Sequence, residues 1–267
     1  MMRGSESMNF VLDNGECCGG EQWISNKAKE RHFHVGYGHD SCRSTSMPHI
    51  TTYINDVDKK GITPSMLLEK KVMSTKEHFL IYTNSHCIGF REDAFVRIAI
   101  AFKEKLVYNG GKCNGTKVSN HLLQKQLEDV RNIKAYGGHE RSLHFQNKDM
   151  NKKFRFCLVM ENTKIDGYIS EKILNAFLGG CIPIYYGSED IFQIFNRNAF
   201  IYYNVSDPTT ALDWISHLEM NHTAYDEVMN ESILVYGRDT IENYLALNGT
   251  LKTKIREMVK RETAYKG

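Results

Sequence analysis

The chain has 267 residues, and its 41% hydrophobic content is enough for a sizeable core, which favours two lobes over one. Its 34 basic and 32 acidic side chains leave a formal charge of +2, so nothing draws the whole chain to nucleic acid or to a membrane surface. No stretch reaches the ~20 apolar residues of a membrane span, and the N-terminus has no apolar signal core. These features predict a soluble, cytoplasm-like protein, or a lumenal protein of the Golgi from which an anchor has been removed.

The first part of the chain is polar and rich in glycine and histidine, as in the stretch "HFHVGYGHD". These residues are too few for a complete second α/β domain, because a domain with its own core needs more chain. We therefore expect residues 1–75 to form a reduced N-terminal lobe.

From about residue 78, short apolar runs alternate with segments of helical spacing. The apolar runs predict strands at 78–84, 106–112, 154–161, 181–187 and 199–204. Helical spacing predicts helices at 91–106, from Glu171 after an N-cap at Ser170, and at 207–220 after Asp207 and Pro208. Residues 113–153 are poor in apolar side chains, so we expect an exposed insertion there, with one helix near 120–133. The alternation predicts an α/β fold with a parallel sheet covered on both faces.

The seven cysteines are odd in number and scattered, at positions 17, 18, 42, 87, 113, 157 and 181. No Cys-x-x-Cys pair occurs, and two of them lie in apolar runs, so we expect reduced thiols rather than a disulfide frame. Reduced thiols indicate a cytoplasm-like compartment, whereas the Asn-x-Ser/Thr sites favour a secretory one, where such sites are glycosylated. About two of these sites are expected by chance. The chain has five of them, at Asn114, Asn204, Asn221, Asn230 and Asn248.

The stretch "GYISEKILNAF" (167–177) places Glu171 and Lys172 at the predicted start of a helix. The helix N-terminus carries partial positive charge and suits Glu171, but it repels the ammonium of Lys172. A bound phosphate would explain Lys172, and Glu171 could then accept hydrogen bonds from the hydroxyls of a ribose. The alternative is an ordinary first turn, with a solvated lysine. Ligands of such sheets bind at the carboxyl ends of the strands, so the loops after Glu161, Gly111 and Gly187 belong near the site.

Two other groups could bind a metal, but neither is convincing. Asp56 and Asp58 lie in a polar loop with no strand before it, and a solvated turn explains them. His32, His34 and His39 lack a reliable fourth ligand in a glycine-rich segment. No Gly-x-Gly-x-x-Gly or Walker loop occurs, which argues against dinucleotide or ATP chemistry.

The stretch "FRFCLVMENTKIDGYISEKILNAFLGGCIPIYYGSEDIFQIFNRNAFIYYN" (154–204) resembles the donor-binding core of the α1,3/α1,4-fucosyltransferases, glycosyltransferase family 10. The shared pattern is Glu-Asn after a strand, then Tyr-Ile-Ser-Glu-Lys, a helix, and Ile-Pro-Ile before a glycine turn. Upstream, "TNSHCIGFREDAF" and "NGGKCNG" resemble the family's Ser-Asn-Cys…Arg helix start and its Gly-Lys-Cys turn, and "HVGYGHDSCRSTSMPHITTYI" resembles an earlier segment.

The resemblance implies a GT-B-like fold with two Rossmann-type lobes, of which the N-terminal one is reduced or truncated. Residues 1–75 would then be the reduced acceptor lobe, 76–235 the lobe that binds the GDP-sugar, and 236–267 a C-terminal helical segment. The family's nucleotide-binding positions fall on Asn162, Tyr168, Glu171 and Lys172, with Glu171 at the ribose and Lys172 at the diphosphate. Lys112 of the glycine turn and Arg91 are further candidates for the diphosphate.

The activity implied is inverting transfer of fucose from GDP-fucose to a GlcNAc-type glycan hydroxyl, in α1,3 or α1,4 linkage. GDP-fucose and a glycan acceptor would be the partners, and no cofactor is required, although Mn²⁺ or Mg²⁺ could stimulate the reaction. The family's general base is an N-terminal glutamate, for which Glu16 is the candidate and Glu21 the fallback. Transfer of another GDP-sugar is the nearest alternative. A catalytically inactive subunit that binds nucleotide or glycan is another, and the short N-terminal lobe favours it.

Overall fold

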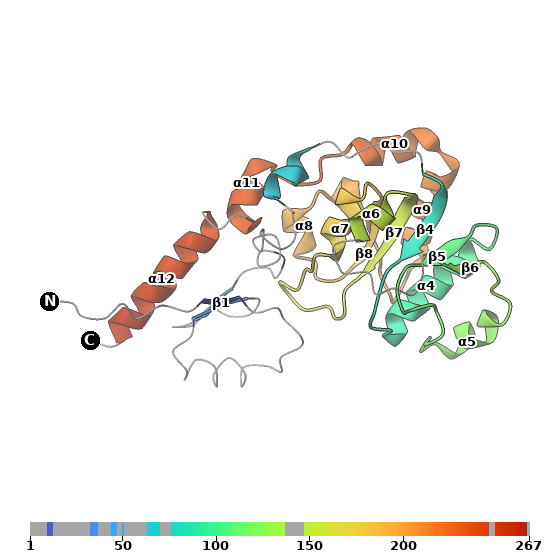
Figure 1. The fold of residues 1–267 in the computed structure, drawn as a ribbon, viewed down its shortest axis with the longest axis horizontal. Helices are drawn as coiled ribbons and strands as arrows, with labels where there is room; N and C mark the ends of the chain where they lie inside the picture. Colours follow the sequence, from blue (N-terminus) through green and yellow to red (C-terminus); the bar gives the residue numbers. More distant parts are fainter. Residues whose placement is uncertain are drawn as a thin grey trace.

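The computed structural model describes residues 76–136, 147–245 and 249–265, together with 10–12, 33–36, 44–46, 50 and 63–69 (Figure 1). Its main feature is a six-stranded sheet in the order β6-β5-β4-β7-β8-β9, in which every pairing is parallel. The strands are β4 (His78–Tyr82), β5 (Val107–Asn109), β6 (Ile133–Ala135), β7 (Phe154–Met160), β8 (Ile182–Tyr186) and β9 (Ile201–Tyr202). The five strands expected from the apolar runs are confirmed.

The order of the strands changes direction at the centre of the sheet. From β4 the chain adds β5 and β6 on one side, and it then crosses back to lay β7, β8 and β9 on the other. β4 and β7 are therefore neighbours, with Tyr82 opposite Leu158. Such a switch point leaves a crevice at the carboxyl ends of the two strands, where open α/β sheets bind their ligands.

Helices cover both faces of this sheet, as expected for a parallel sheet. On β7, Phe156, Leu158 and Met160 pack into one core, while Cys157 and Val159 pack into the other. The first core includes side chains of α4 (Gly89–Ala101), α9 (Thr209–Met220) and α10 (His222–Asn230). The second core includes side chains of α7 (Lys172–Leu178) and α8 (Ile191–Ile194), with η2 (Arg197–Ala199) beside them. β7 carries no polar alternation because both of its faces are buried.

The segment 113–153, expected as an exposed insertion with one helix near 120–133, contains that helix and is mostly exposed where it is described, but it also joins the sheet through an edge strand. The segment contains α5 (His121–Leu127), the edge strand β6 and α6 (Asn147–Asn151). Asn132 is buried, and its side-chain amide donates to the backbone oxygens of Ala99 and Lys105, at 2.9 and 2.8 Å. The polar composition misled because an edge strand with partly exposed residues needs few apolar side chains.

The expectation of reduced thiols is also wrong, because two disulfides occur. Cys87 pairs with Cys113 at a Cα–Cα distance of 5.1 Å, and Cys157 pairs with Cys181 at 5.9 Å. Each pair joins neighbouring strands or their loops: Cys87 and Cys113 follow β4 and β5, whereas Cys157 lies in β7 and Cys181 directly precedes β8. Partners so far apart in the sequence become neighbours only through the order of the strands.

The described parts near the two ends of the chain, among them β1 (Phe10–Leu12) and α12 (Thr250–Tyr265), lie to one side of the molecule and away from this sheet (Figure 1). A three-stranded parallel sheet contains β1, β2 (Phe33–Gly36) and β3 (Ser44–Ser46), and η1 (Pro64–Leu68) follows. The C-terminal part contains α11 (Arg238–Thr240), the π-helical turn η3 (Ile241–Leu245) and α12. In the described part of the chain, no helix combines the length and the apolar character needed to cross a bilayer.

Several residues singled out in the sequence lie outside the described residues. They are Glu16, Glu21, His32, His39, Asp56 and Asp58, and the side chain of His34 is not described either. Their roles stay predictions.

Candidate functional site

The loops at the carboxyl ends of β5, β4, β7 and β8 lie in that order along one edge of the sheet. This edge carries all the predicted binding residues that the structure describes. Arg91 lies in the first turn of α4 after β4, and Lys112 lies in the loop after β5. Asn162, Tyr168, Glu171 and Lys172 lie in or next to the loop after β7.

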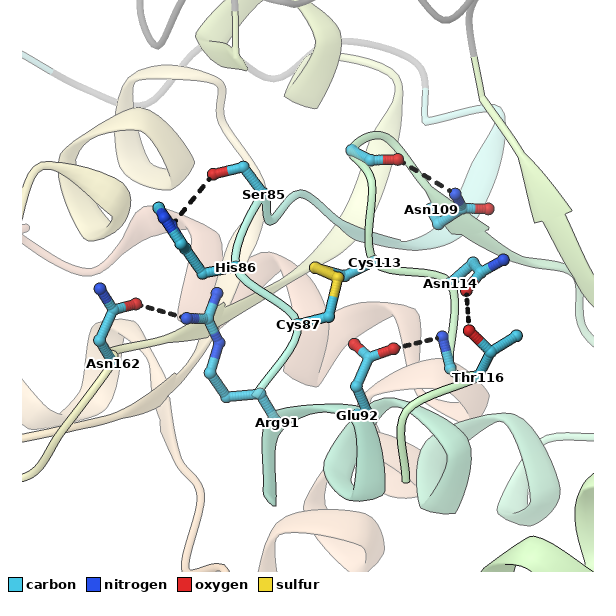
Figure 2. The surroundings of a disulfide bond; sticks show 12 residues. Ser85, His86, Cys87, Arg91, Glu92, Asn109, Cys113, Asn114, Thr116 and Asn162 are labelled. Carbon is cyan, nitrogen blue, oxygen red and sulfur yellow. Dashed lines mark hydrogen bonds between the residues drawn. A yellow bond between two sulfur atoms is a disulfide. The ribbon is translucent and has the colours of Figure 1, made fainter. Parts of the chain in front are cut away.

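Arg91 and Asn162 meet across the switch point between β4 and β7 (Figure 2). The guanidinium of Arg91 donates to Oδ1 of Asn162, so the structure brings these two predicted residues together. Only 1% of Arg91 is exposed, and Arg91 is the largest of the fully buried side chains among the described residues. Its Nε has no hydrogen-bond partner among the described residues.

No carboxylate forms an ion pair with Arg91 in the part of the chain that the structure describes. The adjacent Glu92 is fully buried, and its carboxylate accepts a hydrogen bond from the amide of Gly115, in the loop after β5, at 2.7 Å (Figure 2). A buried cation whose hydrogen-bond partner is a neutral amide is costly, because charges taken out of water need compensation. An anionic ligand at the switch point would supply the missing countercharge.

Lys172 has a different environment, because it lies against the buried Glu161. Its Nζ is 3.1 Å from Oε2 of Glu161, which is 0% exposed, and it donates to Oγ of Ser170 at 2.8 Å. Glu161 also accepts from the amide of Ser170 at 2.7 Å. Burial acts to lower the pKa of Lys172, but the charges of Glu161 and Glu171 outweigh it, so this pKa is raised. A lysine at this helix start is therefore explained without a ligand.

The expected N-cap is wrong in its detail. Helix α7 begins at Lys172, Glu171 occupies the N-cap position, and no side chain caps the helix there. Ser170 does not cap because its hydroxyl donates to the carboxylate of Glu161, with contacts of 2.9 and 2.7 Å to the two oxygens. The hydroxyl of Ser170 thus donates to the buried carboxylate of Glu161 and does not accept from the free backbone amides of the helix.

Tyr168 and Glu171 are both buried, with 5% and 7% of their surface exposed. Both interact with neighbouring groups in this state of the chain. The contact of Glu171 with a ribose and the contact of Tyr168 with the nucleotide stay predictions.

The glycine turn after β5 comes close to the backbone that follows β4. A side chain at Gly111 would lie 2.3 Å from the backbone oxygen of Asn84, so only glycine fits. That same oxygen accepts from the amides of Lys112 and Cys113, at 2.9 and 3.2 Å. The side chain of Lys112 is exposed and forms no ion pair within the described ranges, so its charge is available to a ligand at this edge.

Sequence reasoning missed Glu161, Glu92 and Asn84 as parts of the site. Glu161 directly follows β7 and Asn84 lies two residues after β4, and polar residues at the carboxyl ends of these strands are the signal that could have found them. Nothing in the sequence shows that Glu92 reaches Gly115. Among the described residues, no group of three His, Cys, Asp or Glu side chains is arranged to hold a metal ion.

Comparisons with known proteins match the same region. Residues 101–230, from the end of α4 to the end of α10, match the model of glycosyltransferase family 10 (fucosyltransferase), C-terminal domain. An α-(1,3)-fucosyltransferase of Helicobacter pylori is 32% identical over 114 residues, which is 40% of this chain and 23% of that protein. The GDP-fucose protein O-fucosyltransferase 3 of Mus musculus is 27% identical over 189 residues, 69% of this chain and 36% of that protein. The chain thus spans about a quarter to a third of these relatives.

Solved structures agree on the fold. A crystal structure of an α1,3-fucosyltransferase superposes with a TM-score of 0.55 at 14% identity, over 97% of this chain and 92% of that one. A structure of an α1,3-fucosyltransferase with GDP-fucose gives a TM-score of 0.56 at 14% identity, over 97% and 76% of the two chains. The expected α/β, GT-B-like fold is confirmed. Residues 101–230 thus resemble the C-terminal domain of glycosyltransferase family 10, the fucosyltransferases.

Proposed function

We propose that the chain binds GDP-fucose at the carboxyl edge of its six-stranded sheet and transfers fucose, with inversion, to a GlcNAc-type glycan hydroxyl in α1,3 or α1,4 linkage. The observation that carries the proposal is Arg91, a buried cation at the switch point that has no carboxylate partner in the described part of the chain. A diphosphate is an anion of the required charge, and the guanidinium fork suits its oxygens.

The other basic groups at this edge support the same ligand. Lys112 is exposed on the neighbouring loop, and Lys172, although paired with Glu161, is the predicted diphosphate ligand that follows β7. Together they would stabilise the charge that develops on the departing diphosphate. Glu171 and Tyr168 are proposed to meet the nucleoside. The GDP-fucose bound to a protein of similar fold supports the choice of nucleotide.

The proposed step is a displacement at the anomeric carbon of fucose. The acceptor oxygen forms a bond to that carbon from the face opposite GDP, and the bond to the phosphate oxygen breaks with its electron pair leaving on GDP. The acceptor proton passes to a general base, which we propose to be Glu16, with Glu21 as the fallback. No metal is required in this scheme, and activity should persist when EDTA is added.

Glu16→Gln tests the base. The substitution removes the proton acceptor at nearly constant size, so transfer should fall by about 10²–10⁴-fold while GDP affinity is unchanged. Glu21→Gln is the matched control. Loss of transfer in Glu21→Gln alone would assign the base to Glu21, and full activity in both variants would exclude both.

A second acceptor class is favoured by a specific observation. The match to the mouse protein O-fucosyltransferase covers 69% of this chain, against 40% for the bacterial α-(1,3)-fucosyltransferase. The acceptor could therefore be a hydroxyl on a folded protein instead of a glycan.

One experiment separates these alternatives. The chain is incubated with GDP-fucose, and with GDP-mannose as a control nucleotide, against an array of N-acetyllactosamine glycans and a panel of folded protein domains. Transfer to the glycans supports the proposal, transfer to the domains supports the second candidate, and turnover only with GDP-mannose identifies another GDP-sugar. Tight binding of GDP without any transfer would identify a binding subunit.

We further propose that the chain works in an oxidising lumen such as the Golgi. The two disulfides support this, because such bonds persist in oxidising compartments and are rare in the cytosol. The four acceptor asparagines that the structure describes are all exposed: Asn114, Asn204, Asn221 and Asn230. Protein purified from its own cells should therefore lose mass on treatment with peptide N-glycosidase F. An unchanged mass, together with four free thiols at the paired cysteines, would place the chain in a reducing compartment.

A further inference from the structure

The loop after β5 is held to the start of α4 by contacts that the proposed chemistry does not use directly. The disulfide Cys87–Cys113 joins the loop after β4 to the loop after β5 (Figure 2). Cys113 directly follows Lys112, and Cys87 precedes the first turn of α4, which contains Arg91. The bond therefore connects the two segments that carry Arg91 and Lys112.

Glu92 forms a second connection between the same segments. It is fully buried in α4, next to Arg91, and its Oε2 accepts from the amide of Gly115 at 2.7 Å. Gly115 has a φ of +83°, a conformation that favours glycine, so the loop is shaped to bring this amide to the carboxylate. Two fixed points, Cys113 and Gly115, thus follow Lys112 within three residues, and the amide of Lys112 itself donates to the backbone oxygen of Asn84 at 2.9 Å.

We propose that Cys87, Cys113 and Glu92 are positioning residues, which hold Arg91 and Lys112 at a fixed separation to receive the diphosphate of the nucleotide. This inference rests on the proposed function, because it assigns a role towards the same ligand. None of these residues needs to touch the nucleotide. Their effect is to remove the cost of ordering the loop when the ligand binds, which is how preorganised sites gain affinity.

The second disulfide provides a matched control. Cys157 and Cys181 are 24 residues apart, and Cys87 and Cys113 are 26 apart, so the two bonds close loops of nearly equal length. In the chain-entropy account they should therefore stabilise the fold to a similar extent. Cys157–Cys181 joins β7 to the start of β8, and it does not connect the segments that carry Arg91 and Lys112. Loss of this bond should therefore leave the proposed site intact, whereas loss of Cys87–Cys113 should not.

The test compares Cys87→Ser/Cys113→Ser with Cys157→Val/Cys181→Ala in the full chain. GDP and guanosine are titrated into each protein by calorimetry, and thermal unfolding is recorded in parallel. We expect the first variant to bind GDP about tenfold more weakly or worse, with guanosine affinity unchanged. The second variant should keep its GDP affinity although it melts at a lower temperature. Equal GDP affinity in the two variants would overturn the positioning role.

Two substitutions at Glu92 distinguish the effect of its hydrogen bond to Gly115 from the effect of its negative charge. In Glu92→Gln the side-chain oxygen can still accept from the amide of Gly115, so GDP affinity should stay near that of the wild type, while Glu92→Ala should weaken it as the loss of the Cys87–Cys113 bond does. A Glu92→Gln variant as weak as Glu92→Ala would contradict this role.

Hydrogen exchange covers the case in which a variant folds poorly. In the wild type, dithiothreitol converts a disulfide to two thiols and is itself oxidised to a cyclic disulfide. Cys87 is partly exposed, whereas Cys157 and Cys181 are buried, so mild reduction should open the Cys87–Cys113 bond first. We expect faster exchange confined to the amides of Lys112, Cys113 and Gly115, together with weaker GDP binding. Unchanged GDP binding after that bond is open would overturn the inference. A wild type that binds no GDP would instead refute the proposed function, and the positioning role with it.

Discussion

Two basic side chains lie at the same edge of the sheet, at the starts of the helices that follow the neighbouring strands β4 and β7, and their partners differ. Lys172 lies 3.1 Å from the carboxylate of Glu161, so its charge is balanced within the chain. Arg91 donates to the neutral amide of Asn162 and forms no ion pair in the described residues. The first cluster is complete without a ligand, whereas the second lacks an anion.

The difference teaches that position alone does not identify a ligand-binding cation. The sequence placed most weight on Lys172, because a lysine at a helix start is unusual. The structure pairs that lysine with Glu161 and leaves Arg91, beside Asn162 at the switch point, as the cation without a carboxylate partner among the described residues. What distinguishes the two is the charge of the partner.

The largest expected effect is on folding, at Lys172. Lys172→Met leaves Glu161 as a buried carboxylate without its cation, which should lower the free energy of unfolding by about 3–5 kcal/mol. Chemical denaturation measures it. Pairing the change with Glu161→Gln removes the buried charge and should restore part of the loss. If Lys172→Met unfolds at the wild-type denaturant concentration, the charge balance assigned to this cluster is wrong.

Arg91→Met should behave in the opposite way. The substitution removes a buried cation that has no carboxylate partner among the described residues, so the free energy of unfolding should be unchanged or raised by about 1 kcal/mol. The same denaturation experiment measures both variants side by side. A loss as large as that of Lys172→Met would mean that Arg91 is balanced by a charge within the chain.

The smallest expected effect concerns pH. Burial acts to lower the pKa of Lys172, the neighbouring carboxylates outweigh it, and this pKa is raised above its ordinary value of 10.5. A base with a raised pKa in the folded state contributes stability that is fully present below 10.5 and is lost as pH rises through the higher folded value. The difference in melting temperature between the wild type and Lys172→Met should therefore be constant up to pH 10.5 and shrink above it. A difference that shrinks already between neutral pH and 10.5 would contradict the raised value.

Much of the fold could be predicted because its signals are local. Local patterns predict three of its features: the apolar run predicts strand β7, the glycines after it predict the end of α7, and Gly110 and Gly111 predict the turn after β5. Strand β6 could not be found in the same way, because an edge strand is stabilised by its backbone pairing with β5 and not by an apolar pattern.

The site was predictable as a set of loops but not as a set of partners. Parallel strands direct their carboxyl ends to one edge, so the placement of Arg91, Lys112 and Asn162 at that edge follows from the alternation alone. The pairing of Lys172 with Glu161 and the two disulfides depend on the order of the strands. That order is a tertiary property, which no spacing in the sequence specifies.

The most direct test of the central claim is the affinity for GDP relative to guanosine, measured by calorimetry in the wild type and in Arg91→Met. The two ligands differ only in the diphosphate, so their ratio isolates the anion from the nucleoside. We expect the wild type to prefer GDP, and Arg91→Met to lose about 2–3 kcal/mol of that preference while guanosine binds as before. A variant that keeps the full preference for GDP would show that the diphosphate is bound without Arg91, and would contradict the account.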